Sequence, residues 1–328
     1  MVDTRHRKSY FLIAVSNKEN LDRCLKSSLA GLPSNISGAW AWCDIRVGDF
    51  VSFLYGARVH NLYRVHSKFC LEDDENQPPY WKPLEFGSGR RRRRYTFPFR
   101  LELEPVRIFT ESLVRVEFSY VSENLLLRGG YRKSHFQADT IDLGNASRLG
   151  KIADIRPNWP SYSSQRFNLK FAFDKSLEDI PKVFTVNEKI LQAAIRHHLS
   201  EVKNLEEFLE KLSIKLEASQ LEVLGEKALP RGYVDILIKE TIPAGLSRKI
   251  IVEVKKERVS ERDFRKVLQY RSEVGKECVA TVIIARKTSN SLRRRFKQVS
   301  FVRYSIKDVL QRKFTFEELV NALEFEYV

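Results

Sequence analysis

The sequence predicts an α+β protein with an N-terminal β-barrel domain that carries short helices and a C-terminal α/β domain with a mixed sheet. The chain has 328 residues, enough for two separate hydrophobic cores. Short aromatic and β-branched runs bounded by turn formers fill the first 145 residues. From about residue 185, apolar residues recur at helical spacing and then alternate with buried strand-like runs. The two halves therefore read as different domains.

The N-terminal half is predicted as residues 1–145. Its strand-like runs are YFLIAV, DFVSFLYG, YTFPFRLELEPVRIF and LVRVEFSYV. One short helix is expected after the SNKEN segment, where Ser16 or Asn17 could accept the first free backbone N–H groups. The next stretch contains RPNWPSYSSQRF, which is rich in proline and serine and lacks periodicity, so residues 146–184 are predicted to be a linker.

The C-terminal half is predicted as residues 185–328. Asn187 can cap a helix that runs to about Val202. Apolar side chains then recur at helical spacing at Leu205, Phe208, Leu209, Leu212 and Leu216. Strands are expected over 233–238, 250–254, 279–285 and 299–304, with a helix over 261–274. One helix between strands is typical of an α/β core with a mixed sheet.

Composition favours a polyanionic partner. Lysine and arginine number 57 against 42 acidic residues, giving a formal net charge of +15 and a pI near 9.6, and neutralising phosphates releases condensed counterions. No apolar run is long enough to span a bilayer and no secretory leader is recognisable, so a cytoplasmic protein is expected. The four scattered cysteines lack metal-ligand spacing and fit reduced, buried thiols.

The segment GYVDILIKETIPAGLSRKIIVEVKK places charges inside apolar strands. Glu253 and Lys255 lie two residues apart and so project to one face of a strand, and Asp235 joins them if the two strands pair across the turn. Two carboxylates repel each other, and a proton or a divalent cation must relieve that repulsion. Magnesium suits such a site because it takes one or two carboxylates together with phosphate oxygens and water. Glu188, at the start of the preceding helix, is a further candidate ligand.

These residues resemble the PD-(D/E)xK nuclease superfamily. Gly232-x-x-Asp235, then Glu253-x-Lys255, then a helix with Tyr270 match its motif, and VNEKILQAAIRHHL around Glu188 is most similar to the NucS-type and Mrr-type branches. The resemblance covers roughly residues 185–310. It implies an endonuclease whose catalytic residues are Asp235, Glu253, Lys255, Glu188 and Tyr270. It implies Mg²⁺ bound by Asp235 and Glu253, with Mn²⁺ as a substitute.

One position departs from the family pattern. The glutamine that usually stands four residues before the helix tyrosine is Lys266 here. Lys266 and Tyr270 still share one helix face that could look into the site. The alternative interpretation is an incidental surface ion pair between Glu253 and Lys255, with Asp235 ending a strand. Apolar residues on both sides of each charge argue against that alternative.

The N-terminal half resembles YTH and EVE domains, members of the PUA-like group that read modified bases. YFLIAVSNKENL, GDFVSFLYG, PYWKPLEF, FPFRLELEPVRIF and LLLRGGYRKSHF carry that resemblance over about residues 9–143. It implies a flipped base held by aromatic faces and by hydrogen bonds to its edge. The residues that it assigns to base binding are Trp81, Asn17, Asn20 and Ser16. Trp40 and Trp42 are candidates for a second wall, or Ala30 replaces that aromatic residue. For each tryptophan, core packing is the alternative.

Five successive arginines in GRRRRRY suggest a phosphate contact. Arginine forks match phosphate oxygens, so a hairpin tip carrying them could lie on a nucleic-acid backbone. The alternative is a solvated loop. The predicted phosphate-binding residues are Arg91, Arg92, Arg93, Arg128, Arg132 and Lys133.

Together these features predict a modification-dependent DNA endonuclease. The first domain would flip and read a modified base in duplex DNA, and the second would hydrolyse a phosphodiester bond with Mg²⁺. One active site cuts one strand, so double-strand cleavage predicts a homodimer. Two other functions remain open, a repair or branched-DNA nuclease and a binding protein, for RNA among others, with an inactive nuclease half.

Overall fold

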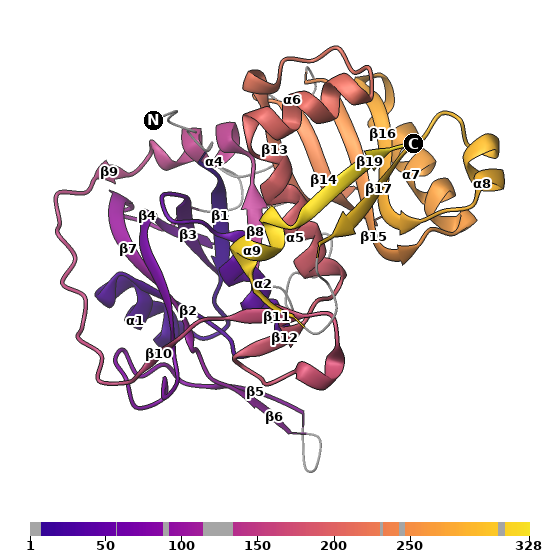
Figure 1. Ribbon diagram of the computed structural model, residues 1–328. Coiled ribbons are helices and arrows are strands. Elements are labelled where there is room, and N and C mark those ends of the chain that lie inside the picture. Colours follow the sequence, from indigo (N-terminus) through magenta and orange to yellow (C-terminus); the bar gives the residue numbers. More distant parts are fainter. Residues whose placement is uncertain are drawn as a thin grey trace. The chain divides into compact units, whose positions relative to one another are not determined.

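The computed structural model describes residues 8–56, 58–87, 92–113, 134–229, 232–242, 247–307 and 312–328 (Figure 1). These residues form two compact units, residues 8–185 and residues 186–328. We call them the first unit and the second unit. Both helices and mixed sheets are present, so the α+β class is confirmed. None of the described helices is long and apolar enough to cross a membrane.

The first unit is built on one large sheet. Its strands are β1 (Tyr10–Ala14), β2 (Leu29–Leu32), β3 (Phe50–Tyr55), β4 (Arg58–Leu71), β7 (Phe99–Ile108), β8 (His135–Ala138), β9 (Lys151–Ile152) and β10 (Arg166–Phe167). The order is β2-β7-β4-β3-β1-β8, with β9 beside β7 and β10 beside β4. Only β1 and β3 pair in parallel along this path. Within the described residues the sheet stays open, with β2 and β8 at its edges, so the predicted β-barrel is not found as a closed barrel.

The described part of the first unit also contains three α-helices, a short 3-10 helix (Lys175–Leu177) and two smaller strand pairs. The α-helices and strand pairs are α1 (Lys18–Ser27), α2 (Ile36–Asp44), α4 (Thr140–Ser147), the hairpin β5 (Leu84–Phe86) with β6 (Arg93–Tyr95), and the parallel pair β11 (Lys170–Ala172) with β12 (Val183–Thr185). Asparagines start the first two helices, because Asn17 Oδ1 accepts the N–H groups of Glu19 and Asn20, and Asn35 Oδ1 accepts two N–H groups of α2.

Residues 146–184 do not stand apart as a linker between the units. Ile152 in β9 pairs with Arg107, and Arg166 in β10 pairs with Leu71, so both strands extend the large sheet. The ring of Trp159 stacks on that of His66 at 4.7 Å between centroids. A stretch rich in proline and serine can thus still be fixed by short strands and aromatic contacts.

The second unit is a six-stranded mixed sheet with helices. Its elements are α5 (Glu188–Leu199), α6 (Val202–Lys211), β13 (Leu221–Leu229), β14 (Gly232–Glu240), β15 (Lys249–Arg258), α7 (Glu261–Val274), β16 (Cys278–Lys287), α8 (Asn290–Arg295), β17 (Ser300–Ile306), β18 (Lys313–Thr315), α9 (Phe316–Asn321) and β19 (Leu323–Tyr327). The sheet order is β13-β14-β15-β16-β17-β19, and the β15-β16-β17 pairs are parallel. The mixed sheet predicted for this half is therefore confirmed.

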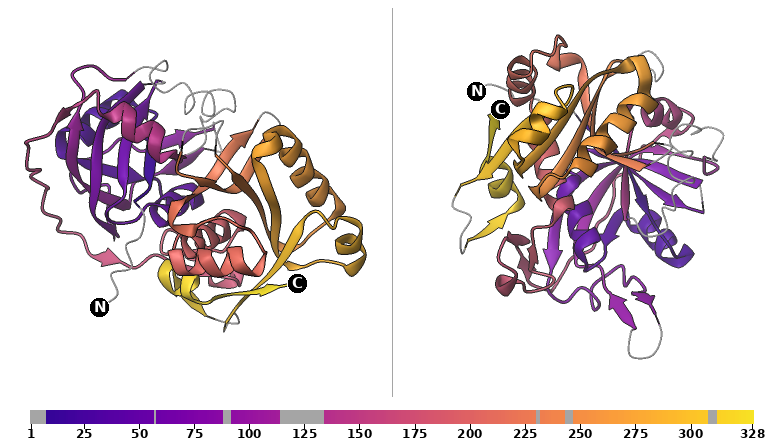
Figure 2. Two further views of the ribbon diagram at one scale, coloured as in Figure 1. Left: turned by 90° about the horizontal axis from the view of Figure 1, so that it is seen from above. Right: turned by 90° about the vertical axis from the view of Figure 1, so that its right-hand side faces the viewer.

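Helices cover both faces of this sheet. Figure 2 shows α5 and α6 on one face and α7 on the other. On the α7 side, Phe264 and Val267 pack with Ile251, Ile283 and Phe301 in one buried cluster. Because alternate strand residues share a face, Glu253 and Lys255 follow Ile251 onto the α7 side at the carboxyl end of β15.

Candidate active site

The candidate site lies where β14 and β15 stop pairing. Their ladder runs from Lys239 opposite Lys249 to Ile236 opposite Val252. One residue beyond, Asp235 Oδ2 accepts the backbone N–H of Val254 at 2.7 Å. The Asp235 side chain thus takes the place of the next backbone hydrogen bond between the two strands. This contact holds the Asp235 carboxylate beside the end of β15.

Glu253 is the most deeply buried charge of the site. Its residue has 0% exposed surface. Oε1 accepts a hydrogen bond from Lys266 Nζ at 2.7 Å and lies 3.0 Å from Lys255 Nζ. Oε2 is buried and has no hydrogen-bond partner among the described residues. Oε1 is therefore occupied by two ammonium groups, and Oε2 is the oxygen of this carboxylate that could accept a further ligand.

Lys255 is held from several sides. Its Nζ donates to Glu188 Oε1 at 2.9 Å and lies 3.9 Å from Asp263 Oδ1. Glu188 is the first residue of α5, whose N-terminus is capped by Asn187 Oδ1. Asp263 belongs to the capping box that starts α7. Two helix N-termini thus place carboxylates around one lysine, whose side chain is 23% exposed.

Tyr270 closes the site against the start of β14. A Cβ placed on Gly232 would lie 2.1 Å from the Tyr270 hydroxyl, so only glycine fits there. The Nζ of Lys266 sits 5.3 Å from the centre of the Tyr270 ring. Tyr270 therefore lies against the first residue of β14 and beside Lys266.

The charges of the site shift one another's pKa values. Burial raises the pKa of Asp235 well above its usual value, and the neighbouring Glu253 carboxylate adds to that rise. Burial alone would lower the pKa of Lys255 and of Lys266, yet the attraction of Glu253 raises both. Burial also raises the pKa of Tyr270. The charges of Lys255 and Lys266 lower the pKa of Asp235, but less than burial and Glu253 raise it.

A divalent cation fits this donor set. Glu253 Oε2, which has no hydrogen-bond partner in the described part of the structure, and the carboxylate of Asp235 would be the protein ligands of such an ion. No group of three or more histidine, cysteine, aspartate or glutamate side chains at metal-binding spacing occurs in the described part of the chain. Two carboxylates with the remaining positions left to water and phosphate oxygens are the usual protein share of a Mg²⁺ site.

The structure brings together all five residues predicted as catalytic. Lys266 and Asp263 also belong to the cluster. The sequence signal for Lys266 is its four-residue spacing to Tyr270 on one helix. Asp263 carries no such signal, because a capping box explains its position by itself.

In the first unit, Trp81 is packed into the core. Its residue is 8% exposed, and the guanidinium of Arg100 lies 5.0 Å from the ring centre. The ring also lies against the backbone of Gly31, where a Cβ would come within 2.6 Å. Phe97 meets it edge-on at 5.7 Å. The faces of Trp81 are thus in contact with protein groups, and the ring is not an open stacking platform.

Asn20, Trp40 and Trp42, also predicted to bind a base, have structural contacts as well. Asn20 bonds the backbone of Lys82 twice, at 2.9 and 2.8 Å, which ties the Trp81 loop to α1. Trp40 is buried and meets His135 edge-on at 4.4 Å. Trp42 lies under Lys68, whose Nζ is 4.0 Å from the ring centre.

Three further positions belong to the same prediction. Asn17 caps α1, Ser16 is exposed, and Ala30 is buried in β2 opposite Leu101.

A pocket of about 280 Å³ does occur in the first unit, but none of the predicted base-binding residues lines it. Its walls come from the end of α1, from β4 and β7, and from the segment after β9. The lining residues are Leu25, Lys26, Ser27, Ser28, Asn61, Tyr63, Pro105, Ile108, Ile155, Arg156, Pro157 and Asn158.

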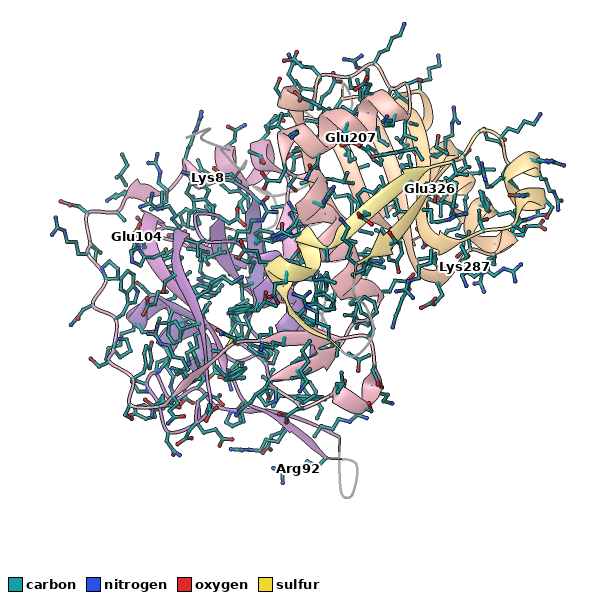
Figure 3. All side chains as sticks on the ribbon, viewed as in Figure 1. Lys8, Arg92, Glu104, Glu207, Lys287 and Glu326 are labelled. Carbon is teal, nitrogen blue, oxygen red and sulfur yellow. The ribbon has the colours of Figure 1, made fainter. Side chains whose placement is uncertain are left out.

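The predicted phosphate-binding residues are only partly described. Arg92 and Arg93 lie at the β5–β6 hairpin and are exposed, and Arg92 pairs with Glu85 across it (Figure 3). Arg91, Arg128, Arg132 and Lys133 lie outside the described residues. The neighbouring Arg94 pairs with Glu75.

Comparisons with known proteins give little further information. No family model matches the sequence, and no curated protein matches it. A solved structure described as "Structure of EndoMS-dsDNA2 complex" is similar at 12% identity over 90% of this chain and 96% of that chain, with a TM-score of 0.22. A TM-score this low does not establish a shared fold.

Proposed function

We propose that this protein is a Mg²⁺-dependent endonuclease that hydrolyses phosphodiester bonds in DNA. The observation that carries the proposal is the Asp235 and Glu253 pair beside a lysine held by Glu188. Strongly perturbed charges that converge at one end of a sheet are typical of functional sites. Glu253 Oε2 is buried and has no hydrogen-bond partner within the described ranges, which supports the same conclusion because a purely structural ion-pair network would leave this oxygen uncompensated.

Each residue has a chemical task in that reaction. A bound Mg²⁺ would polarise the scissile phosphate and lower the pKa of an attacking water. Asp235 and Glu253 would hold that ion. Lys255 is charged and partly exposed, so its ammonium can neutralise charge that develops on the phosphate oxygens. Glu188 fixes the direction of the Lys255 side chain.

Basic residues at the same sheet edge support a nucleic-acid substrate. β15 and β16 are parallel, so their carboxyl ends lie together, with Lys255 beside Ala285 and Arg258 beside Lys287. Arg258 and Lys287 are exposed, and Figure 3 shows Lys287 at this edge. Positive side chains that flank a carboxylate cluster would hold a phosphate backbone across it.

We further propose that the first unit selects the substrate through a modified base in duplex DNA. What supports this is the resemblance of residues 9–143 to base-reading domains and the exposed arginines at the β5–β6 hairpin. Cutting both strands then requires two copies of the chain, since each holds one candidate site.

Cleavage of matched DNA substrates tests this proposal. The substrates are plasmids without modification, with N6-methyladenine or with modified cytosine, a branched duplex, and a single-stranded RNA. Each is incubated with Mg²⁺, Mn²⁺ or EDTA. The variants are Lys255→Ala and the control Lys276→Ala, which removes the same charge from an exposed residue before β16.

The expected result is metal-dependent cutting of a modified plasmid by the wild type and by Lys276→Ala. Lys255→Ala should be slower by about 10³-fold or more. Equal cutting of all plasmids would support the nuclease activity and contradict the requirement for a modified base. Cutting of the branched duplex alone would favour a repair role. No cutting of any substrate would contradict the proposed function.

A further inference from the structure

We propose that Lys266 is a positioning residue that supplies a fixed positive charge to Glu253 and thereby limits the candidate site to one weakly held divalent cation. This inference rests on the proposed function and deepens it. Lys266 stands where the resemblance leads us to expect an uncharged glutamine. The site therefore carries one positive charge more than a glutamine at that position would give it.

The contact with Glu253 gives that charge a specific effect. Lys266 Nζ and Lys255 Nζ both lie on Oε1, at 2.7 and 3.0 Å, while Oε2 has no partner in the described part of the structure. An oxygen that already contacts two ammonium groups is a poor ligand for an additional cation. Glu253 is thus left with one oxygen for a metal ion, which disfavours a bridging role between two ions.

The other carboxylate of the pair is restricted in the same way. Asp235 Oδ2 accepts the Val254 N–H at 2.7 Å, so part of its donor capacity is used by the backbone. Each of the two ligands therefore has one oxygen engaged with the protein. A single ion shared between the remaining oxygens is the arrangement that these contacts favour.

The charge balance of the cluster agrees with one ion. The cluster contains four carboxylates, those of Asp235, Glu253, Glu188 and Asp263. Its two ammonium groups belong to Lys255 and Lys266. The formal charge is −2, which one divalent cation balances. Without the Lys266 charge the same cluster would attract a divalent cation more strongly.

A purely structural role for Lys266 makes a different prediction. The side chain is 36% exposed, so its ammonium is still partly hydrated and is not needed to fill the core. Glutamine at this position removes the charge and keeps an N–H donor on a side chain one bond shorter, and methionine removes both the charge and the donor. If Lys266 only stabilised the fold, this change would alter unfolding and leave cation affinity as it was.

Titration of the full chain with Mn²⁺ in the absence of DNA tests the inference. Calorimetry gives the dissociation constant, and the electron paramagnetic resonance of free Mn²⁺ gives the number of ions bound. The variants are Lys266→Gln, Lys266→Met and Lys266→Arg. Arg265→Gln is the matched control, because it removes one charge from the adjacent residue of α7, whose side chain is 65% exposed and pairs with Glu261 outside the site. Thermal unfolding of each variant shows that it is folded.

The wild type should bind one Mn²⁺ per chain. Lys266→Gln should bind it about tenfold more tightly, as expected for removing a like charge a few ångströms from a divalent ion. Lys266→Met should change affinity in the same direction, whereas Lys266→Arg and Arg265→Gln should stay near the wild type. If Lys266→Gln does not fold, Lys266→Met decides the question.

Three results would overturn the inference and leave the nuclease proposal intact. They are unchanged affinity in the charge-removing variants, weaker affinity in them, and two ions bound by the wild type. Failure of the wild type to bind any divalent cation would overturn the inference together with the proposed metal dependence.

Discussion

The two units of this protein use their polar and aromatic side chains in contrasting ways. In the second unit, charges from α5, β14, β15 and α7 meet within hydrogen-bond distance, and one buried oxygen, Glu253 Oε2, has no hydrogen-bond partner among the residues that the structure describes. In the first unit, Asn17, Asn20 and Trp81 are engaged in a helix cap, a loop contact and core packing. A charge inside an apolar strand is therefore the more informative sequence feature, because it needs a compensating partner.

Aromatic residues are weaker sequence evidence for a binding site than buried charges are, because a protein core and a base pocket both favour large apolar rings. A large flat apolar ring stabilises either one. Trp81 illustrates this, since its ring contacts Arg100 and Phe97 in place of a ligand. Substitutions in each unit therefore test whether a side chain packs the core or contacts a ligand.

The largest effect on stability is expected for Trp81→Ala. Removing this buried ring should destabilise the first unit by about 3–5 kcal/mol. Phe86→Ala is the control, because Phe86 is 52% exposed. Urea unfolding measures the change, and DNA binding is followed in parallel. If Trp81→Ala weakens binding while stability stays unchanged, the ring is a ligand platform and the contrast between the units fails.

A smaller loss is expected for Gly232→Ala in the second unit. The new Cβ would meet the Tyr270 hydroxyl at 2.1 Å, and such overpacking should destabilise the unit by about 1–3 kcal/mol. Adding Tyr270→Phe should restore part of that loss, because it removes the atom that clashes. Gly144→Ala in α4 is the comparison, since its Cβ would make only an ordinary contact at 3.6 Å from Tyr10. Equal effects of the two glycine changes would contradict the tight packing of Tyr270.

A gain of stability is expected for Asp235→Asn. The pKa of Asp235 is raised in the folded state by burial and by Glu253. Its stabilising contribution is therefore present below the ordinary carboxyl pKa, near 4, and is lost as the pH rises through the folded value. Asparagine can still accept the Val254 N–H but carries no charge. At pH 8 the variant should be more stable by about 1–2 kcal/mol, and the difference should shrink as the pH falls.

Thermal unfolding across pH, with and without Mg²⁺, measures this difference. Mg²⁺ should stabilise the wild type more than Asp235→Asn, because the variant lacks one of the two proposed ligands. A variant that is less stable than the wild type at every pH would show that the Asp235 charge is compensated within the protein.

The smallest effect is expected at the hairpin of the first unit. Arg92 and Arg93 are exposed, so replacing both with alanine should change stability by less than about 0.5 kcal/mol. If both arginines contact phosphates, DNA binding should weaken for all sequences alike. The slope of the logarithm of the binding constant against the logarithm of the salt concentration should fall by about two in magnitude. Binding measured at several salt concentrations tests this. An unchanged slope would mean that the hairpin does not touch the backbone of DNA.

The local elements of the second unit could be predicted well from sequence. Asn187 marked the start of α5, and α7 was predicted at its observed bounds. β14, β16 and β17 were found within about two residues because their apolar runs end at charges or turn formers, whereas β15 continues to Arg258, past the predicted end at Val254. β13 and β19 were missed, since LEVLGEKAL and LEFEY mix charged and apolar residues. Their place in the sheet depends on pairing with distant strands.

The first unit was harder to predict for the same reason. Its sheet is assembled by long-range pairing such as β1 with β3, and local patterns do not tell an open sheet from a barrel. β9 and β10 are two residues each, too short to leave a periodic signal in a segment rich in proline and serine. In the candidate site, the spacing of Glu253 and Lys255 was readable, whereas the contacts of Asp263 depend on the fold.

Two glutamates on β15 test whether the buried carboxylate of Glu253 takes part in DNA cleavage. Single-turnover cleavage of DNA with Mg²⁺ is measured for the wild type, for Glu253→Gln and for Glu257→Gln, whose side chain is 62% exposed in the wild type. We expect Glu257→Gln to cut like the wild type and Glu253→Gln to be slower by about 10³-fold or more. Equal cleavage by the two variants would contradict the proposed nuclease function, because the buried carboxylate would then have no part in the reaction.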